Sequence, residues 1–433
     1  MRKELAYLMG QNALQFDSQW MEKNPVWTNW SLRHTPFSLY SNNGWAYLWL
    51  HPMLLPNFSW VDASKQTQFR EKDCPWRGNT MIELESKYCG IVDTMYISNA
   101  LVIPYLYHEA FHAFQQQWMK NRWHNFSLWA KYPEDDVENI ALSHIENQIL
   151  LSSIPAAERI ARFASIRKYR LSLLSDEMSD FDQKGLLVEG TASYVEKRII
   201  MVLLQSFDTV FSDLMKKTHQ EEIIEYVNET ALKINTSQLI YRWFGIGYRL
   251  GTALDILLPK WKKCLMEKPV LWEDLLEEYF SMSDSVKSLL NTFHYDKTLR
   301  CVEIKQQQRN QEIQTRIRNI QNTTERKLRL YYKNLHPTGF VFSPSDMIVV
   351  NAKMKLHTTI FGLQFSDEFN IDIKDTDVVE YVTEKYFECI LPDDYSIKKE
   401  QNILTMKAKG LHIHIPYKKW VQAANGDSIT IST

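Results

Sequence analysis

The chain has 433 residues, of which 45% are hydrophobic and 24% are charged, a composition typical of folded globular proteins rather than disordered ones. Its 50 basic and 52 acidic residues give a net charge of -2, so the sequence offers no electrostatic basis for binding nucleic acid or an anionic membrane. The five cysteines show no C-x-x-C spacing, which argues against a disulfide framework and against a thiolate zinc site.

The beginning of the chain, MRKELAYLMGQNALQF, lacks the continuous apolar run of a secretory signal peptide. No stretch approaches the roughly 18 apolar residues of a membrane span. We therefore expect a cytoplasmic protein without a membrane span, although a secreted form that had lost its leader would show the same pattern. The sequence predicts no oligomeric state.

The first hundred residues have the pattern of loops and strands. Short segments rich in β-forming residues occur at 44–51, 79–86 and 90–98, and Asn43-Gly44 is a turn signal before the first of them. From Pro104 onward, apolar residues recur at helical spacing, which predicts a helix over 104–119.

Helical periodicity continues through the middle of the chain. One helix begins after Pro133 at the acidic run EDDVE, where negative charge is favourable, and another follows Pro155. Further helices are predicted over 186–204 and 247–258. A polar helix over 303–333 has sparse apolar positions, and its basic face is interpreted as solvated surface.

Beyond HPTG (336–339) the period of the apolar residues changes to two, as in MIVVNA, EFNIDI, ILTMKA, LHIHIP and SITIST. This pattern predicts a separate β module. We therefore expect an α+β protein with a mainly helical domain and an N-terminal β-sheet over 1–300. A connecting helix over 301–335 and a small C-terminal β module over 336–433 would follow.

Residues 107–115, YHEAFHAFQ, place two histidines four positions apart in the predicted helix 104–119. Side chains four apart on a helix project about 40° from each other, so His108 and His112 can direct imidazole nitrogens at one ion. Glu109 is rotated by about 100° and cannot easily be a third ligand, but it can reach a water at the metal. The pattern H-E-x-x-H thus predicts a zinc site with Glu109 as general base.

Catalytic zinc has three protein ligands and one open position, so a third ligand must come from elsewhere in the chain. The metzincin continuation is absent, because Gln115 and Trp118 occupy two of its required positions. The best candidate is Glu189 in VEGTASYVE, where small residues leave room for a neighbouring helix. The alternative is a surface residue, but the apolar LLV before Glu189 predicts burial, and a buried glutamate needs a cation or a partner.

YHEAFHAFQ followed by EGTASYVE resembles the gluzincin arrangement of zinc metallopeptidases, in which H-E-x-x-H precedes a glutamate helix of the form E-G-x-A-x-Y. ENQILLSSI, RFASIRKYRLSLL, LLVEGTASYVE and GYRLGTALDILLPKW also follow the order seen in a group of bacterial zinc hydrolases. The resemblance spans roughly residues 79–280 and is weaker over the β module. It implies a zincin-like catalytic domain in which His108, His112 and Glu189 bind Zn²⁺ and Glu109 is the base.

The surroundings of this site are less well defined by the sequence. Thr191 and Ser193 depart from the resemblance, since leucine and glutamate are usual there, although neither departure removes a ligand. Glu196 lies seven residues after Glu189 on the same helical face and could orient a ligand histidine. Glu146, in SHIENQ, competes for that role, and either acid could instead make an ordinary polar contact.

Two tyrosines are candidates for stabilising an oxyanion. The resemblance places the helix of Tyr248 near the metal, where its phenol could donate a hydrogen bond to developing negative charge. A packed aromatic residue is the alternative, and Tyr194 has the same ambiguity. The small residues Gly251 and Ala253 predict close packing of the Tyr248 helix against the helix of H-E-x-x-H.

The remaining candidate motifs give weaker evidence for a metal site or for catalysis. His412 and His414 alternate on a predicted strand and face the same side, but exposed histidines on a sheet face explain the pattern better than a metal site does. No Cys/His nucleophile pattern, G-x-S-x-G or P-loop occurs.

The leading hypothesis is a zinc metallopeptidase that cleaves peptide or protein substrates, with Glu109 as base and Tyr248 as oxyanion donor. The strand at 90–98 could hold an extended peptide by edge pairing. One alternative is hydrolysis of a non-peptide amide, because nothing in the sequence recognises a substrate side chain. Another is a binding protein that has kept the fold and lost turnover, but the intact Glu109 speaks against it.

Overall fold

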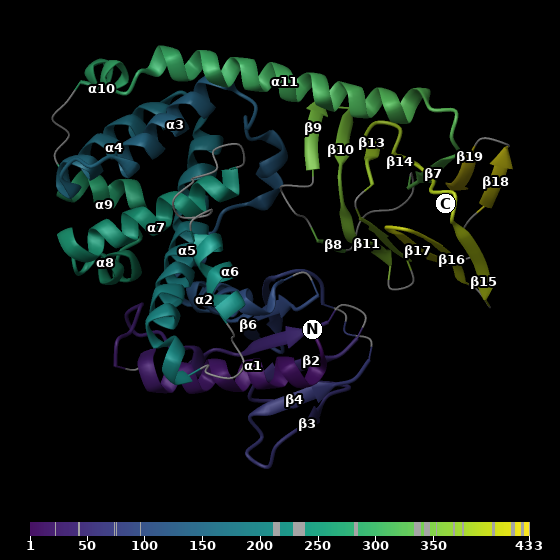
Figure 1. Ribbon diagram of the computed structural model, residues 1–433, viewed down its shortest axis with the longest axis horizontal. Helices are drawn as coiled ribbons and strands as arrows, with labels where there is room; N and C mark the ends of the chain where they lie inside the picture. The colour runs from purple at the N-terminus through teal and green to yellow at the C-terminus, as the bar shows by residue number, and fades with distance from the viewer. Residues whose placement is uncertain are drawn as a thin grey trace. The chain divides into compact units, whose positions relative to one another are not determined.

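The computed structural model describes the whole chain apart from residues 22, 42–43, 73, 75, 96, 211–216, 228–238, 281–284, 333–338, 342–346, 352, 367–368, 375, 401–402, 417–420, 426–427 and 433. The chain divides into two compact units, Met1–Val302 and Glu303–Thr433 (Figure 1). Helices dominate the first unit and strands the second, which confirms the α+β class. None of the described helices is long and apolar enough to span a membrane.

The first unit contains a small sheet and most of the helices of the chain. Its strands are β1 (Phe37–Tyr40), β2 (Ala46–Trp49), β3 (Ser59–Trp60), β4 (Thr67–Arg70), β5 (Thr80–Leu84) and β6 (Lys87–Asp93). Its helices are α1 (Lys3–Phe16), α2 (Val102–Met119), α3 (Val137–Leu151), α4 (Ala156–Ser172), α5 (Asp176–Val210), α6 (Lys217–Val227), α7 (Leu239–Leu257), α8 (Trp261–Glu267), α9 (Trp272–Tyr279), α10 (Val286–Thr292) and α11 (Tyr295–Asn322), the last of which continues into the second unit.

Helix α1 is absent from the sequence prediction, which treats the first hundred residues as loops and strands. Its buried side chains recur at helical spacing, so the apolar periodicity for this helix is present in the sequence. Asp17, directly after α1, is buried and accepts a hydrogen bond from the hydroxyl of Tyr107 at 3.1 Å. The N-terminal segment therefore helps to hold α2, the helix of H-E-x-x-H. The predicted turn at Asn43-Gly44 lies partly outside the described residues.

The sheet has the strand order β3-β4-β2-β1-β6-β5, and β6 pairs in parallel with β1 and antiparallel with β5. The segment predicted as a strand at 90–98 therefore begins earlier, at Lys87, and ends at Asp93. Because β6 has a neighbour on each side, it has no free edge, and the prediction that it holds a peptide by edge pairing is wrong. The terminal strand on this side of the sheet is β5.

Helix α2 packs against β6 at a point where the strand carries glycine. A Cβ on Gly90 would lie 2.4 Å from the backbone nitrogen of Ala110 and 2.5 Å from the carbonyl carbon of Glu109. Contacts this short do not occur between packed atoms, so glycine is required for the observed approach of helix to strand. The sheet thus sets the position of the backbone that carries the H-E-x-x-H motif.

Helices α5 and α7 approach each other closely through small residues. A Cβ on Gly247 would lie 2.1 Å from the Cα of Gly190, and one on Gly251 would lie 2.3 Å from the ring of Tyr194. Gly190 contacts Gly247, and Tyr194, one turn later in α5, contacts Gly251, one turn later in α7. The two helices therefore run parallel. Gly251 was expected to pack against the H-E-x-x-H helix; its neighbour is instead α5, the glutamate helix.

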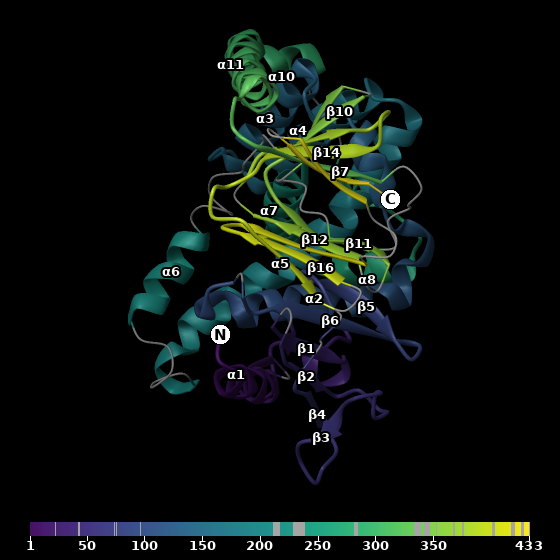
Figure 2. The same ribbon diagram turned by 90° about the vertical axis from the view of Figure 1, so that its right-hand side faces the viewer.

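The second unit contains two sheets whose strands are mostly antiparallel (Figure 2). Buried side chains from both sheets form one hydrophobic core. The first has the order β18-β19-β7-β14-β13-β10-β9 and the second the order β15-β16-β17-β12-β11-β8. Their strands are β7 (Lys327–Tyr331), β8 (Gly339–Val341), β9 (Met347–Asn351), β10 (Met354–His357), β11 (Ile360–Ser366), β12 (Phe369–Ile373), β13 (Val378–Tyr381), β14 (Tyr386–Ile390), β15 (Ser396–Glu400), β16 (Ile403–Ala408), β17 (Leu411–Pro416), β18 (Val421–Asn425) and β19 (Ser428–Ser432).

The polar helix predicted over 303–333 begins and ends earlier, because α11 runs from Tyr295 to Asn322 and β7 follows within the predicted range. Its sparse apolar residues Ile313, Ile317 and Ile320 are buried against side chains of β9, β10 and β13. The β module therefore begins before residue 336, and the last turns of α11 belong to its core rather than to a free connecting helix.

Candidate metal centre

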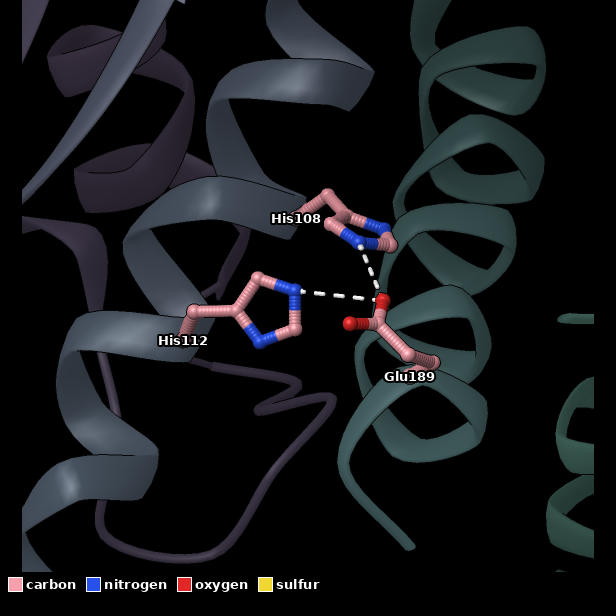
Figure 3. Close-up of side chains that lie close together, drawn as sticks. All are labelled: His108, His112 and Glu189. Atoms are coloured by element: carbon pink, nitrogen blue, oxygen red, sulfur yellow. Dashed lines mark ion pairs between the residues drawn. The ribbon is translucent and has the colours of Figure 1, made fainter. Parts of the chain in front are cut away.

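Three predicted ligands lie together between α2 and α5 (Figure 3). Nε2 of His108 is 3.7 Å from Oε2 of Glu189, and Nε2 of His112 is 3.5 Å from the same oxygen. One ligand atom from each residue lies within 4.8 Å of the others. All three side chains are buried, with at most 6% of each residue exposed, as predicted for Glu189 from its apolar approach.

A carboxylate supports the ring of His108 from the side opposite Glu189. Nδ1 of His108 lies 2.9 Å from Oε2 of Glu196. Because an ionised carboxylate can only accept, Nδ1 carries a proton, and Nε2 is the ring nitrogen that faces the cluster. Glu196 therefore has the orienting role proposed for it from helical spacing.

Glu196 is itself held by two groups, of which Lys197 is buried and Tyr226 is half-buried. Its Oε1 accepts hydrogen bonds from Nζ of Lys197 at 2.7 Å and from the hydroxyl of Tyr226 at 2.6 Å. Burial alone would raise the pKa of Glu196, but the charge of Lys197 and the hydrogen bond from His108 outweigh it and lower the pKa to about 2. The Glu196 carboxylate is thus ionised at neutral pH, as an acceptor for His108 must be.

His112 is supported by an amide rather than by a carboxylate. Its Nδ1 lies 2.6 Å from Oε1 of Gln115, while Nε2 of Gln115 donates to Oγ1 of Thr191 at 2.7 Å and to the Val188 carbonyl at 2.9 Å. These two donations identify the amide oxygen as the atom that faces His112, so Nδ1 donates and Nε2 is free for a metal. Thr191, which departs from the resemblance, contributes directly to this support.

Sequence reasoning missed Gln115 as part of the site and noted it only as a break in the metzincin pattern. Its position one helical turn after His112 was a usable signal, since residues three apart are neighbours on a helix. Thr191 likewise lies close to Glu189 in the chain. The hydroxyl of Ser193, the other departure, has no hydrogen-bond partner among the described residues.

Glu146 does not compete with Glu196 for the histidines, and that alternative is wrong. Its Oε1 accepts a hydrogen bond from Nε of Arg170 at 2.7 Å. Arg170 also donates to Asp182 at 2.7 Å, and Arg167 lies 3.4 Å from the same acid. These side chains form a buried ionic cluster that links α3, α4 and α5 and does not include the ligands.

The two candidate tyrosines have different surroundings. Tyr194 donates its hydroxyl to Oδ2 of Asp255 at 2.6 Å and packs against tryptophan rings, which supports a structural role. Tyr248 is half-buried on α7, and its hydroxyl makes no hydrogen bond within the part of the chain that the structure describes. Phe244, one turn earlier, is the α7 residue whose ring contacts His108, at 5.6 Å between ring centroids.

Glu109 is buried on α2 beside the two histidines, and among the described residues its carboxylate makes no hydrogen bond. Burial raises the pKa of Glu109, as do the charges of Glu189 and Glu196, whereas the two histidines oppose the shift. A carboxylate with a raised pKa and no hydrogen-bond donor is suited to accept a proton and to release it again.

The cluster has the electrostatic character of a cation site. Burial would lower the pKa of His108, but the nearby carboxylate of Glu189 and the hydrogen bond to Glu196 raise it to about 10. Burial would raise the pKa of Glu189, but the charge of His112 and the close approach of both imidazoles hold it well below its usual range. Positive charge near Glu189 is therefore strongly stabilised, and a divalent metal ion could supply that charge in place of protons.

A further histidine, His124, approaches the second carboxylate oxygen of Glu189, Oε1, whereas His108 and His112 approach Oε2. Its Nε2 is 3.9 Å from Oε1 of Glu189, and its side chain is fully enclosed. Burial lowers the pKa of His124 to about 4, with the charge of Glu189 opposing the shift. Neither ring nitrogen has a hydrogen-bond partner among the described residues. His124 belongs neither to the H-E-x-x-H motif nor to the glutamate helix, so no pattern in the sequence identifies it as part of the site.

No protein-family model, curated protein or solved structure matches this chain. Within the described residues, this is the one group of three or more histidine, cysteine or acidic side chains close enough to hold a metal ion. His412 and His414 are not in it; they are half-buried, with ring centroids 4.4 Å apart.

Proposed function

We propose that this protein is a zinc-dependent hydrolase with a zincin-like first unit, and that its reaction is peptide-bond cleavage. The observation that carries the proposal is the convergence of His108, His112 and Glu189 at one buried point, with Glu109 beside them. Two imidazoles and one carboxylate are the ligand set of many catalytic zinc sites, which keep a fourth position open for water.

The supporting side chains fit zinc better than a chance cluster would. Each ligand histidine donates Nδ1–H to an acceptor, Glu196 or Gln115, which orients Nε2 toward Glu189. Such partners fix the tautomer and the ring orientation that a zinc ligand needs. Only nitrogen and carboxylate donors are present, so the set also suits other divalent transition metals, and zinc is chosen because the reaction needs no redox change.

When bound at this point, zinc would lower the pKa of a water and polarise the scissile carbonyl. Glu109 accepts the proton of the attacking water and returns it to the leaving amine, as its raised pKa and free carboxylate permit. Tyr248 is the proposed donor to the developing oxyanion, because this residue is half-buried and its hydroxyl makes no hydrogen bond among the described residues. An extended substrate would pair with β5, the strand at the end of the sheet.

The proposal is tested first by metal content. Purified wild-type protein should hold about one zinc per chain in elemental analysis, and His112→Ala should hold substantially less. Glu109→Gln is the matched control, because it changes a buried neighbour in the same helix without removing a ligand, and it should keep its zinc. Equal zinc in wild type and His112→Ala would show that the site is wrongly placed.

Activity is tested separately with a peptide library. Wild type should cleave some of its members, and Glu109→Gln should cleave them on the order of 10²–10⁴ times more slowly, because its amide cannot accept the proton. Cleavage by both proteins at the same rate would remove Glu109 from the mechanism. A zinc-loaded protein that cleaves no peptide but hydrolyses other amides would retain the metal site and change the substrate class.

A further inference from the structure

His124 lies beside the proposed metal centre without belonging to its ligand set. Its Nε2 is 3.9 Å from Oε1 of Glu189, the carboxylate oxygen that does not face His108 and His112. It is not a member of the group whose ligand atoms all lie within 4.8 Å of one another. In this geometry His124 reaches the metal position only through Glu189.

The ring of His124 is fixed by aromatic neighbours from three segments. Its centroid lies 4.2 Å from the Phe126 ring, 5.5 Å from Trp243 and 5.9 Å from Phe181. A phenylalanine ring would fill such an apolar surrounding without burying polar atoms. Histidine instead leaves two nitrogens unpaired among the described residues, and a buried nitrogen without a partner destabilises the fold. Filling space therefore does not explain why the residue is histidine.

We infer that His124 is a positioning residue that donates Nε2–H to Oε1 of Glu189 when Oε2 holds a metal ion. The present separation of 3.9 Å is about 1 Å longer than an N–H···O hydrogen bond. Rotation of the carboxylate about its terminal bond can close it, because that torsion has a broad energy minimum. This inference rests on the proposed function, since it assigns a role around the same metal.

The consequence concerns how many oxygens Glu189 gives to the metal. A carboxylate can bind through one oxygen or through both, and the second would occupy the position that a water needs. A hydrogen bond from His124 to Oε1 keeps that oxygen off the metal. His124 thus maintains an open coordination position without touching the substrate or the metal.

The experiment uses the full-length protein loaded with cobalt(II) in place of zinc. The visible absorption of cobalt(II) reports coordination geometry, being stronger for four ligands than for five or six. His124→Phe removes the donor and keeps the ring. His124→Gln places an amide N–H near the original Nε2, whereas the shorter His124→Asn cannot reach Glu189. His51→Phe is the matched control, because His51 is similarly buried and its hydrogen bonds among the described residues go to backbone groups of Met53 and Leu84.

His124→Phe should weaken metal binding by roughly 10–100-fold in a chelator competition and should reduce the cobalt absorption. His124→Gln should restore both values toward wild type, and His124→Asn should resemble His124→Phe, which keeps the test decisive if the phenylalanine variant does not fold. His51→Phe should leave both values unchanged. Wild-type spectra and affinity in all three His124 variants would refute the positioning role while leaving the metal site intact. Failure of the wild type to take up cobalt or zinc would refute the proposed function itself, and this inference with it.

Discussion

Replacing Gly90 by alanine should disturb both stability and the proposed metal centre, because this glycine sets the distance between β6 and α2. The added Cβ would meet the backbone nitrogen of Ala110 at 2.4 Å, about 1 Å inside the ordinary contact distance of 3.4 Å. Backbone atoms cannot rotate away as a flexible side chain can, so the helix itself must shift. Overpacking of this kind costs about 1–3 kcal/mol, and the backbone clash places Gly90→Ala near the upper end of that range.

The assay is chemical denaturation together with zinc affinity. A helix displaced by about 1 Å carries Glu109 with it, and a misplacement of that size can reduce turnover by about 10²-fold. Gly44→Ala is the control, since a Cβ there meets its nearest atoms at an ordinary 3.5 Å, and its stability should change by no more than about 0.5 kcal/mol. If Gly90→Ala unfolds at the same denaturant concentration as wild type and binds zinc equally well, the close approach is not required for the site.

Three further predictions concern other parts of the chain. Tyr248→Phe should lower kcat by roughly 10–10³ with zinc content and KM little changed if its hydroxyl serves the oxyanion, and an unchanged kcat in steady-state kinetics would assign it to packing alone. Asp182→Asn should destabilise the protein by about 3–5 kcal/mol in urea denaturation at pH 7, because it removes the carboxylate that Arg170 and Arg167 share and leaves buried positive charge that Glu146 alone does not balance. Burial would raise the pKa of Asp182, but Arg170 and Arg167 hold it far below its usual range. The contribution of the ionised Asp182 to the free energy of unfolding is therefore fully present above about pH 4 and is lost progressively as the pH falls. The difference in unfolding free energy between wild type and Asp182→Asn should shrink in acid. A chain that ends at Val302 should still bind zinc in elemental analysis, because all three proposed ligands lie in the first unit, and loss of zinc from a folded truncated protein would contradict this division.

The parts of the site that depend on local geometry could be predicted from the sequence. A separation of four residues on a helix is enough to bring His108 and His112 to one side, whatever the helix packs against. The apolar residues before Glu189 were enough to predict its burial. The sequence contains the same kind of signal for helix α1, whose buried positions recur with helical period.

Other features depend on which distant segments pack together, and sequence spacing does not contain that information. Glu146 and Glu196 are both buried acids on helices, and only the packing of α2 against α5 rather than against α3 brings Glu196 to His108. The order of strands leaves β5 rather than β6 at the end of the sheet because β1 pairs with β6, from which it is separated by about fifty residues of chain. His124 reaches Glu189 from a segment without regular periodicity. Its position follows from aromatic contacts with Phe126, Phe181 and Trp243, and such contacts arise from the folded packing of three segments, not from any spacing along the chain.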